Sequence, residues 1–391
     1  MSKSFQNKNV LSIAFAHYMH DVYTAFFAPV LSELIVKLGI SNFMAGVLSF
    51  VQRAPSLFNP FIGMFIDRLQ IRYFVIFTPA VSCITMSLFG ASPFYIVAVI
   101  LMLVTGINAA FFHVPAPVLI KNFAGDRIGR GMSFYMVGGE LARSTGPVVI
   151  AAAIAAWGLE GTFRLIPFGV AASVFLWIRF KDIRITPRKK DKNMGAKYKK
   201  TLKKHLPFFI LIGGIIFFRA FMKTAIVQFL PTYFRFSGQN LWFGSSSLSV
   251  FEIAGAVGTF FAGNLSDRFG RMNTLLVITL ITPLIMLLFV FSSGFWVFPI
   301  LILLGFFMLA SGPVVLAFVM DKATEHQTFM NGIYMFITFV SGSVGALLNG
   351  AMGDWFGWVN TYKIDAFIAL LAIPFVLYLK FSKKSAESRS S

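Results

Sequence analysis

A six-residue motif occurs twice in this chain, first as Gly63-Met64-Phe65-Ile66-Asp67-Arg68 and then, 200 residues later, as Gly263-Asn264-Leu265-Ser266-Asp267-Arg268. Each copy has a glycine followed four residues later by Asp-Arg, and each stands at the end of an apolar stretch. One copy could arise by chance, whereas two copies at equivalent places are very hard to explain in that way. The repeat therefore predicts a chain made of two similar halves.

The composition indicates a protein whose main solvent is lipid. Charged residues make up 13% of the 391 residues, against roughly a quarter in an ordinary soluble domain. Hydrophobic residues make up 57%, and 48 residues are Phe, which is more apolar surface than one soluble core can bury. The net charge of +19 could suggest a nucleic-acid partner, but the basic residues stand between the apolar stretches, as in cytoplasmic loops of membrane proteins. We therefore expect a lipid bilayer, and no nucleic acid, as partner.

Apolar stretches of about 20 residues, the length that crosses a bilayer as a helix, recur along the whole chain. The first half contains six of them, near residues 9–36, 42–66, 72–91, 94–119, 131–157 and 161–180. The second half contains another six, near residues 206–234, 242–266, 272–292, 294–319, 328–353 and 360–380. The sequence thus predicts an all-α membrane protein with twelve transmembrane helices. The N-terminus lacks the cleavage site of a signal peptide, so we expect the first span to be retained.

A basic segment separates the two sets of helices, with eleven Lys or Arg and only two acidic residues between positions 181 and 204. It is expected to be a solvated linker, and binding to anionic headgroups is the alternative. The expected divisions are an N-terminal six-helix bundle, the cytoplasmic linker, and a C-terminal six-helix bundle with a short tail, over residues 1–180, 181–205 and 206–391. Most of the 34 Lys and Arg residues lie on the side of this linker and of both termini. This bias predicts that all three are cytoplasmic, in a cell inner (plasma) membrane.

The repeated motif has a physical role at the cytoplasmic ends of the helices. A glycine, here Gly63 or Gly263, allows two helices to approach closely. Asp67 and Asp267 can cap the N-terminus of a neighbouring helix, where the helix dipole favours a negative charge. The basic residues that would anchor the loops are Arg68, Arg268 and Arg271. Such contacts form a gating latch that holds one conformation and releases in another, or they serve folding and topology alone; the sequence leaves both open.

Further motifs accompany the repeat in the first half of the chain. They are His17-Tyr18-Met19-His20-Asp21, Phe26-Phe27-Ala28-Pro29, Phe112-His113-Val114-Pro115-Ala116, Gly131-Met132-Ser133, Val137-Gly138-Gly139 and Ser144-Thr145-Gly146-Pro147. Through the doubled Gly-x-x-x-Asp-Arg motif the chain resembles the major facilitator superfamily along its whole length, and through these motifs it resembles the fosmidomycin-resistance branch. The resemblance implies the major facilitator fold, with parallel halves of six helices each. It also implies secondary transport, because the founding members of that branch are drug exporters driven by the proton gradient.

Three ionisable residues, His17, His20 and Asp21, lie near mid-membrane in the first span. His17 and Asp21 are four residues apart and share a helix face. An ionisable side chain at such a depth costs a few kcal/mol or more, so it is a functional candidate. Burial disfavours the charged form of a carboxyl group and a nearby cation favours it, and this competition is what a proton-coupling site needs. A static hydrogen-bonded cluster is the alternative.

Other charges of the first half lie at a similar depth. Arg53 can pair with Asp21 or with a substrate. Glu140 and Arg143 are three residues apart on one helix face, which favours a structural ion pair, with a pair that breaks and re-forms during transport as the next interpretation. The same helix contains residues that favour close packing and bending: Gly138, Gly139, Gly146 and Pro147.

The second half places Arg219, Lys223 and Glu252 near mid-membrane. With Asp21, Glu140, Arg53 and Arg143 of the first half, the buried charges then sum to one positive charge in excess. An excess cation in a desolvated site is best offset by an anionic ligand, which Arg binds through its fork of donors and Lys as a point charge. This balance predicts an anionic substrate, unless one cation reaches water or another acid approaches it.

His113, toward the cytoplasmic end of the fourth span, suits proton exchange or substrate binding, and equally a packing role beside Pro115. The chain lacks a phosphate-binding Gly-Lys-Ser loop and the patterns typical of metal ligands or nucleophiles, so we expect no cofactor, no metal and no enzymatic activity. The leading prediction is a monomeric secondary transporter that exports an anionic or amphipathic small molecule in exchange for protons. The alternatives are uptake or exchange of an organic anion, either a carboxylate or a phosphate ester, and a non-transporting membrane sensor.

Overall fold

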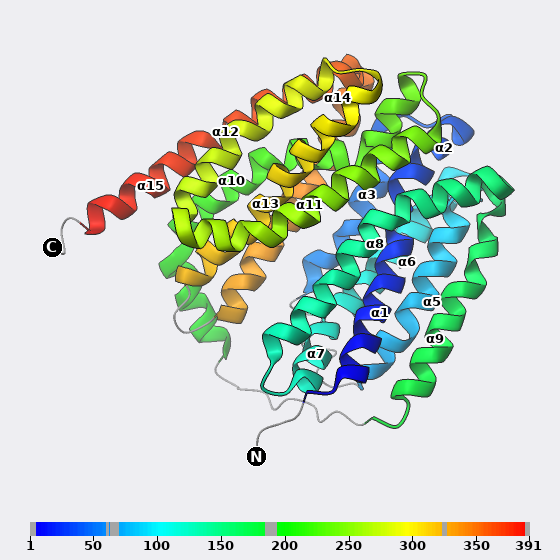
Figure 1. The fold of residues 1–391 in the computed structure, drawn as a ribbon, viewed down its shortest axis with the longest axis horizontal. Coiled ribbons are helices and arrows are strands. Elements are labelled where there is room, and N and C mark those ends of the chain that lie inside the picture. Colours follow the sequence, from blue (N-terminus) through cyan, green and yellow to red (C-terminus); the bar gives the residue numbers. More distant parts are fainter. Residues whose placement is uncertain (1–4, 60–61, 63–69, 184–193, 323–326, 388–391) are drawn as a thin grey trace. The chain divides into compact units, whose positions relative to one another are not determined.

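A computed structural model of the chain describes residues 5–59, 62, 70–183, 194–322 and 327–387 (Figure 1). Over these ranges the chain is helical and contains no strand. The helices of the first half are α1 (Asn7–Thr24), α2 (Phe27–Leu38), α3 (Asn42–Arg53), η1 (Ala54–Phe58), α5 (Arg72–Phe89), α6 (Tyr95–His113), α7 (Ala116–Ala124), α8 (Ile128–Trp157), η2 (Glu160–Leu165) and α9 (Ile166–Phe180). Those of the second half are α10 (Met194–Phe236), α11 (Leu241–Phe269), α12 (Arg271–Val290), η3 (Gly294–Trp296), α13 (Val297–Lys322), α14 (Gln327–Leu370) and α15 (Ile373–Glu387).

Eight helical segments of the described chain are long and apolar enough to cross a membrane. The longest, Phe329–Phe381, covers two of the predicted spans. Predicted spans 9–36, 42–66 and 131–157 are not among the eight. The first two are divided into shorter helices, whereas the third is the continuous helix α8, which contains Glu140 and Arg143. The all-α fold is confirmed, and twelve transmembrane helices are consistent with this arrangement.

Proline interrupts two of the spans next to the candidate site. The first span is divided after Thr24, and the second of its helices has Pro29 in its first turn. The fourth span is divided after His113, with Pro115 in the break. A proline lacks an N–H group and its ring clashes with the carbonyl four residues earlier, so a helix ends before it. The structure therefore differs from two continuous helices, and both breaks follow closely after the residues of the site.

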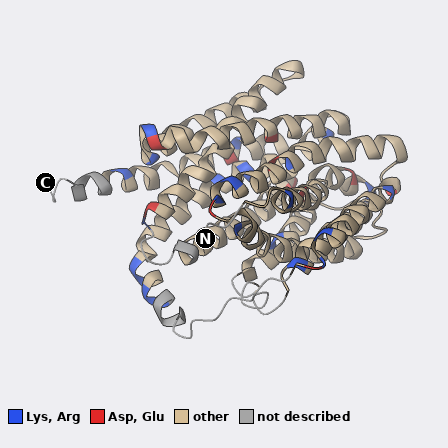
Figure 2. Ribbon diagram, turned by 60° about the horizontal axis from the view of Figure 1, so that its bottom comes forward, with Lys and Arg blue, Asp and Glu red and all other residues tan. Residues whose placement is uncertain are grey.

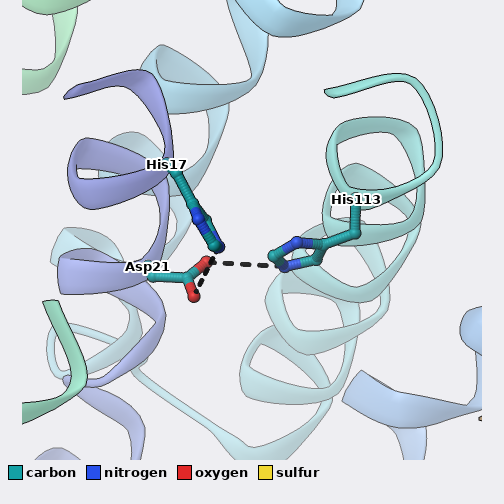
Figure 3. Close-up of side chains that lie close together, drawn as sticks. All are labelled: His17, Asp21 and His113. Carbon is teal, nitrogen blue, oxygen red and sulfur yellow. Dashed lines mark ion pairs between the residues drawn. The ribbon is translucent and has the colours of Figure 1, made fainter. Parts of the chain in front are cut away.

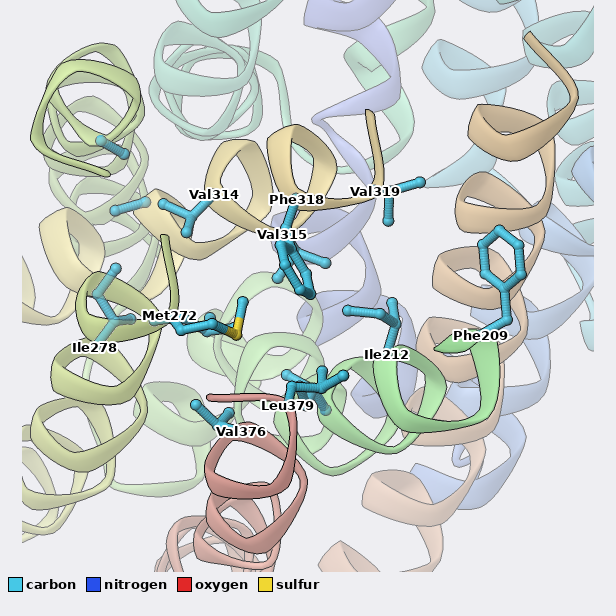
Figure 4. Close-up of a cluster of buried hydrophobic side chains, with 14 of the residues drawn as sticks. Phe209, Ile212, Met272, Ile278, Val314, Val315, Phe318, Val319, Val376 and Leu379 are labelled. Carbon is cyan, nitrogen blue, oxygen red and sulfur yellow. The ribbon is translucent and has the colours of Figure 1, made fainter. Parts of the chain in front are cut away.

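The helices pack into two compact units, one of Met1–Lys189 and Gln228–Ser249, the other of Lys190–Val227 and Val250–Ser391. Each unit has its own apolar core. The core of the first includes Val10, Ile13, Val75, Phe112, Ile120 and Leu176. The core of the second, drawn in Figure 4, includes Phe209, Ile212, Ile278, Val314, Phe318, Val376 and Leu379. The predicted domain boundaries stay a prediction, although the last part of the expected linker, from Met194, is helical.

Glycines bring α1 and α8 into close contact in the first unit. A Cβ atom on Gly146 would lie 2.6 Å from Cβ of Ala25 and 2.8 Å from the carbonyl oxygen of Val22. Gly138, two turns earlier on α8, faces the backbone of Ala14 in the same way. The close packing predicted for this helix is confirmed, and it holds the side chains of α1 and α8 near one another.

The surface of the helices is apolar. Large side chains that are more than 70% exposed include Phe260, Phe291, Phe295, Trp296 and Trp355. Figure 2 shows that basic and acidic residues occupy few positions along the helices. A soluble protein rarely exposes apolar patches on this scale, whereas helices in lipid must. The surface is therefore that of a multi-pass membrane protein.

Candidate functional site

The carboxylate of Asp21, near the C-terminal end of α1, lies between imidazoles from two helices (Figure 3). His17, one turn earlier on α1, places Nε2 3.2 Å from Oδ2 of Asp21. His113, the last residue of α6, places Nε2 3.4 Å from Oδ1. The side chains of His17 and Asp21 are 5% and 7% exposed, whereas that of His113 is 41% exposed. The cluster thus has a buried part on α1 and one edge, His113, that is less covered by the other helices.

His20 is the third imidazole around the same carboxylate. Its Nε2 lies 3.9 Å from Oδ1 of Asp21, which is too long for a hydrogen bond. Both atoms are buried, and neither has a hydrogen-bond partner in the described part of the chain. On its other side, Nδ1 of His20 lies 2.7 Å from Oγ of Ser82 on α5. Asn108 of α6 donates to that same hydroxyl oxygen at 2.7 Å.

Arg143 of α8 is the cationic partner of Asp21, at 3.5 Å between Nη1 and Oδ2. Its Nη2 atom also pairs with Glu140, as predicted from their spacing. Arg53 is not the partner of Asp21, because it ends α3 and makes no ion pair with that carboxylate in the structure. Two carboxylates thus face one guanidinium, which leaves one negative charge in excess when the histidines are neutral.

Sequence reasoning missed three residues that orient these histidines. The backbone carbonyl of Tyr135 on α8 accepts a hydrogen bond from Nδ1 of His17 at 2.7 Å, and the two rings stack with centroids 3.9 Å apart. Ser82 and Asn108 orient His20. Asn108 was recognisable as an amide within an apolar stretch. The hydrogen bond from His17 goes to the main chain of Tyr135, which no side-chain pattern in the sequence indicates.

Three residues of the cluster are of types that also bind metal ions. The ligand atoms of His17, Asp21 and His113 all lie within 4.8 Å of one another. However, the guanidinium of Arg143 already supplies a positive charge beside Asp21, and a metal ion would have to displace it. The donor set therefore gives no reason to assign a metal, and the arrangement suits a proton better.

The other predicted membrane charges lie outside this cluster. Arg53 is partly buried, and its Nε has no hydrogen-bond partner among the described residues. In the second unit, Arg219 of α10 is buried, and its Nη1 donates to Oγ1 of Thr279 on α12 at 3.4 Å. Glu252 of α11 is buried as well, whereas Lys223, one turn after Arg219, is exposed.

The first copy of the repeated motif, with Gly63, Asp67 and Arg68, lies outside the described residues. In the second copy, Nη1 of Arg271 lies 2.9 Å from Oδ1 of Asp267. Arg271 also pairs with Asp321 near the end of α13 through two nitrogen atoms, Nε and Nη2. The motif therefore joins the ends of three helices through Arg271.

One detail of this motif differs from the expectation. The N-cap residue of α12 is Gly270, without a side-chain cap, so Asp267 meets α12 through Arg271. A Cβ atom on Gly263 would meet no described atom within 4 Å, so the close approach expected at this glycine stays a prediction. The close approach of α11 to α13 occurs further from the motif, at Gly255 and Gly258, which face Leu309 and Phe306. Sequence reasoning also missed Asp321.

Comparison with known proteins finds relatives that are transporters or drug-resistance proteins. A family model described as Major Facilitator Superfamily matches residues 11–346 and 245–391. The fosmidomycin resistance protein of Escherichia coli (strain K12) is 23% identical over 376 residues, which is 93% of this chain and 90% of that protein. An uncharacterized MFS-type transporter of Bacillus subtilis (strain 168), YfnC, is also 23% identical, over 93% of this chain and 91% of its own length.

Solved structures share the fold. A bacterial homolog of the human lysosomal transporter Spinster, in an inward-facing and unoccupied conformation, has a TM-score of 0.77 at 15% identity, over 97% of this chain and 96% of that chain. A D-xylose–proton symporter has a TM-score of 0.74 at 14% identity, over 95% and 97% of the two chains. At these identities the likeness concerns the fold alone.

Proposed function

The chain belongs to the major facilitator superfamily, and from this premise we propose that it is a proton-coupled secondary transporter that exports an anionic or amphipathic small molecule. A protein of this superfamily with transporter folds as its structural neighbours is a transporter and not an enzyme. The proposal of proton coupling rests on one observation: the buried carboxylate of Asp21 lies among three histidines and one arginine.

The charge of this cluster supports proton binding. Asp21 and Glu140 carry two negative charges against the one positive charge of Arg143. An uncompensated buried charge is costly, and one proton makes the group neutral. Loading and unloading that proton changes the partners of Asp21, and a conformational equilibrium responds to such a difference between states.

The substrate class rests on Arg219. The guanidinium of Arg219 is buried, and the one side-chain hydrogen bond it has among the described residues is to neutral Thr279. A buried cation of this kind suits a carboxylate or phosphonate group of a ligand. The relative from Escherichia coli is named for resistance to fosmidomycin, and another similar protein for resistance to tetracycline, which supports export.

Uptake or exchange of an organic anion is the second candidate, because the same charges would serve transport in either direction. A solved neighbour titled as a D-xylose–proton symporter has this fold, so the fold permits both. A non-transporting sensor is less well supported, since the buried charges occur in both halves of the chain. We place the transporter in the inner (plasma) membrane as a monomer, with both termini and the basic linker cytoplasmic.

Inverted membrane vesicles test this proposal. A panel of carboxylates, phosphate esters, phosphonates and amphipathic drugs is offered with and without an imposed pH gradient. Export coupled to protons predicts that at least one anionic or amphipathic compound accumulates in the vesicles only when the gradient is present. The proposal would be contradicted if compounds accumulated equally without the gradient. It would also be contradicted if only neutral sugars accumulated.

A further inference from the structure

The two histidines of the α1 cluster differ in the partner of Nδ1. In His17 this atom lies 2.7 Å from the backbone carbonyl of Tyr135. A carbonyl oxygen only accepts hydrogen bonds, so the hydrogen of this contact belongs to Nδ1 of His17. A neutral His17 therefore carries its single ring hydrogen on Nδ1 and has a bare Nε2.

This bare nitrogen faces a second acceptor. Oδ2 of Asp21 lies 3.2 Å from Nε2 of His17, and an ionised carboxylate also only accepts. Two acceptors at this distance repel unless a proton lies between them. The contact therefore requires one proton, held as an imidazolium beside a carboxylate or as an imidazole beside a carboxylic acid.

His20 has the opposite arrangement. The side-chain amide of Asn108 donates one hydrogen to the carbonyl of Thr78 and the other to Oγ of Ser82. The hydroxyl hydrogen of Ser82 then has one acceptor among its described contacts, Nδ1 of His20 at 2.7 Å. Because Nδ1 accepts, a neutral His20 carries its hydrogen on Nε2 and presents it to Asp21.

We infer that His17 and Asp21 share the coupling proton, while His20 stays neutral as the hydrogen-bond donor that receives Asp21 when the proton leaves. Without the proton, Oδ2 of Asp21 and Nε2 of His17 repel one another. Oδ1 of Asp21 lies 3.9 Å from Nε2 of His20, and both atoms are buried without a hydrogen-bond partner in the described chain. A small rotation of the carboxylate closes that gap, so deprotonation moves Asp21 from one histidine to the other.

Other groups face the same carboxylate and bear on its titration. From α6, His113 approaches Oδ1, and its Nδ1 lies 3.4 Å from the hydroxyl of Tyr135 on α8. From α8, Arg143 approaches Oδ2, with Glu140 bound to the same guanidinium. From α5 the cluster receives the neutral hydroxyl of Ser82. On the described parts of α7 and α9, no charged group makes an ion pair with the cluster.

Ser82 and Asn108 are thus positioning residues, which act on Asp21 through the tautomer of His20. Tyr135 has the corresponding role for His17. The inference deepens the proposed coupling function, and it identifies which of the clustered histidines changes its protonation.

Nitrogen-15 NMR of the full-length purified chain tests this directly, because it separates protonated from bare ring nitrogens. The chain has five histidines, so His17→Gln and His20→Gln variants assign the two signals. Across the range in which histidine ordinarily titrates, about pH 5 to 8, His20 should keep a bare Nδ1 and a protonated Nε2. His17 should keep a protonated Nδ1 throughout, and Nε2 should gain or lose its proton. Titration of His20, or a neutral His17 with its hydrogen on Nε2, would overturn the inference.

A serine variant adds a second readout. Ser82→Ala should abolish the single tautomer of His20, giving a mixture of both neutral forms or a titrating ring. The matched control is Ser173→Ala, because Ser173 is a buried serine whose hydroxyl accepts from the backbone N–H of Ala80; it should leave His20 unchanged. An unaltered tautomer in Ser82→Ala would refute the role of Ser82. These spectra need no substrate. They can therefore refute the protonation states inferred for His17 and His20 while proton-coupled transport is still observed, and they can support those states even if no transport is found.

Discussion

Gly139 of α8 lies against the imidazole of His17 on α1. A Cβ atom at position 139 would come within 2.5 Å of Cε1 and 2.8 Å of Nε2 of that ring, closer than real side-chain atoms approach. The absence of a side chain at Gly139 therefore allows His17 to lie between the backbone of Tyr135 and the carboxylate of Asp21.

Gly139→Ala should therefore displace His17 from Asp21. Overpacking of this kind costs about 1–3 kcal/mol of stability, and we expect gradient-driven transport to fall further than the amount of folded protein. The matched control is Gly129→Ala on the same helix, where a Cβ would meet no described atom within 4 Å. Transport per folded molecule in reconstituted vesicles is the measurement; equal values for the two variants would contradict the role of Gly139.

The latch prediction concerns Asp67, Asp267 and Asp321. Each Asp→Asn change should slow transport more than it reduces abundance in the membrane. The side chains of Asp267 and Asp321 are 64% and 52% exposed, and ion pairs at such positions contribute about 0–1 kcal/mol to stability. Transport rate and membrane abundance are measured together. Variants that transport normally per molecule, or that only fail to accumulate, would assign the motif to folding.

Much of this fold could be predicted from the sequence, because lipid imposes long apolar helices and the Asp-Arg motif recurs after 200 residues. Asp21, His17 and His113 could be identified as candidates since ionisable groups are costly at depth. The breaks at Pro29 and Pro115 are local consequences of proline that hydropathy alone does not locate.

The pairing of Asp21 could not be predicted from sequence in the same way. Arg53 and Arg143 lie at similar depths along their helices, and the choice between them depends on which helices are neighbours. Because α1 packs closely on α8 through Gly138 and Gly146, the arginine that pairs with Asp21 is Arg143 of α8. The backbone contact of Tyr135 with His17 was beyond reach, because every residue has a carbonyl group.

The topology prediction is that the basic linker is cytoplasmic. The single cysteine, Cys83, is buried, so introduced cysteines can be labelled over a low background. Arg188→Cys, in the basic segment, should react only from the cytoplasmic side. Phe295→Cys, at an exposed position at the start of predicted span ten, should react only from the periplasmic side. The reverse pattern would contradict the orientation.

The substrate prediction concerns Arg219 and Lys223. Replacing either with Gln removes a charge-assisted contact worth about 1.5–3 kcal/mol, so the apparent Km for an anionic substrate should rise roughly ten- to a hundredfold. Thr279→Val is the control for the neutral partner of Arg219, and it should have a smaller effect. Unchanged affinity in both Gln variants, for a confirmed substrate, would discard the anion argument.

The coupling prediction concerns Asp21. Asp21→Asn keeps the shape of the side chain but cannot lose a proton, so it mimics the protonated form permanently. It should abolish gradient-driven accumulation of substrate while leaving exchange between equal pools intact. Glu160→Gln removes a carboxylate whose side chain is 76% exposed and should behave as the parent.

Accumulation of substrate in reconstituted vesicles with an imposed pH gradient is the most direct test of proton coupling at Asp21. The parent chain and Glu160→Gln should concentrate substrate, and Asp21→Asn should only equilibrate it. If Asp21→Asn concentrates substrate as the parent does, Asp21 is not the coupling site, and Glu140 and then Glu252 become the residues to test.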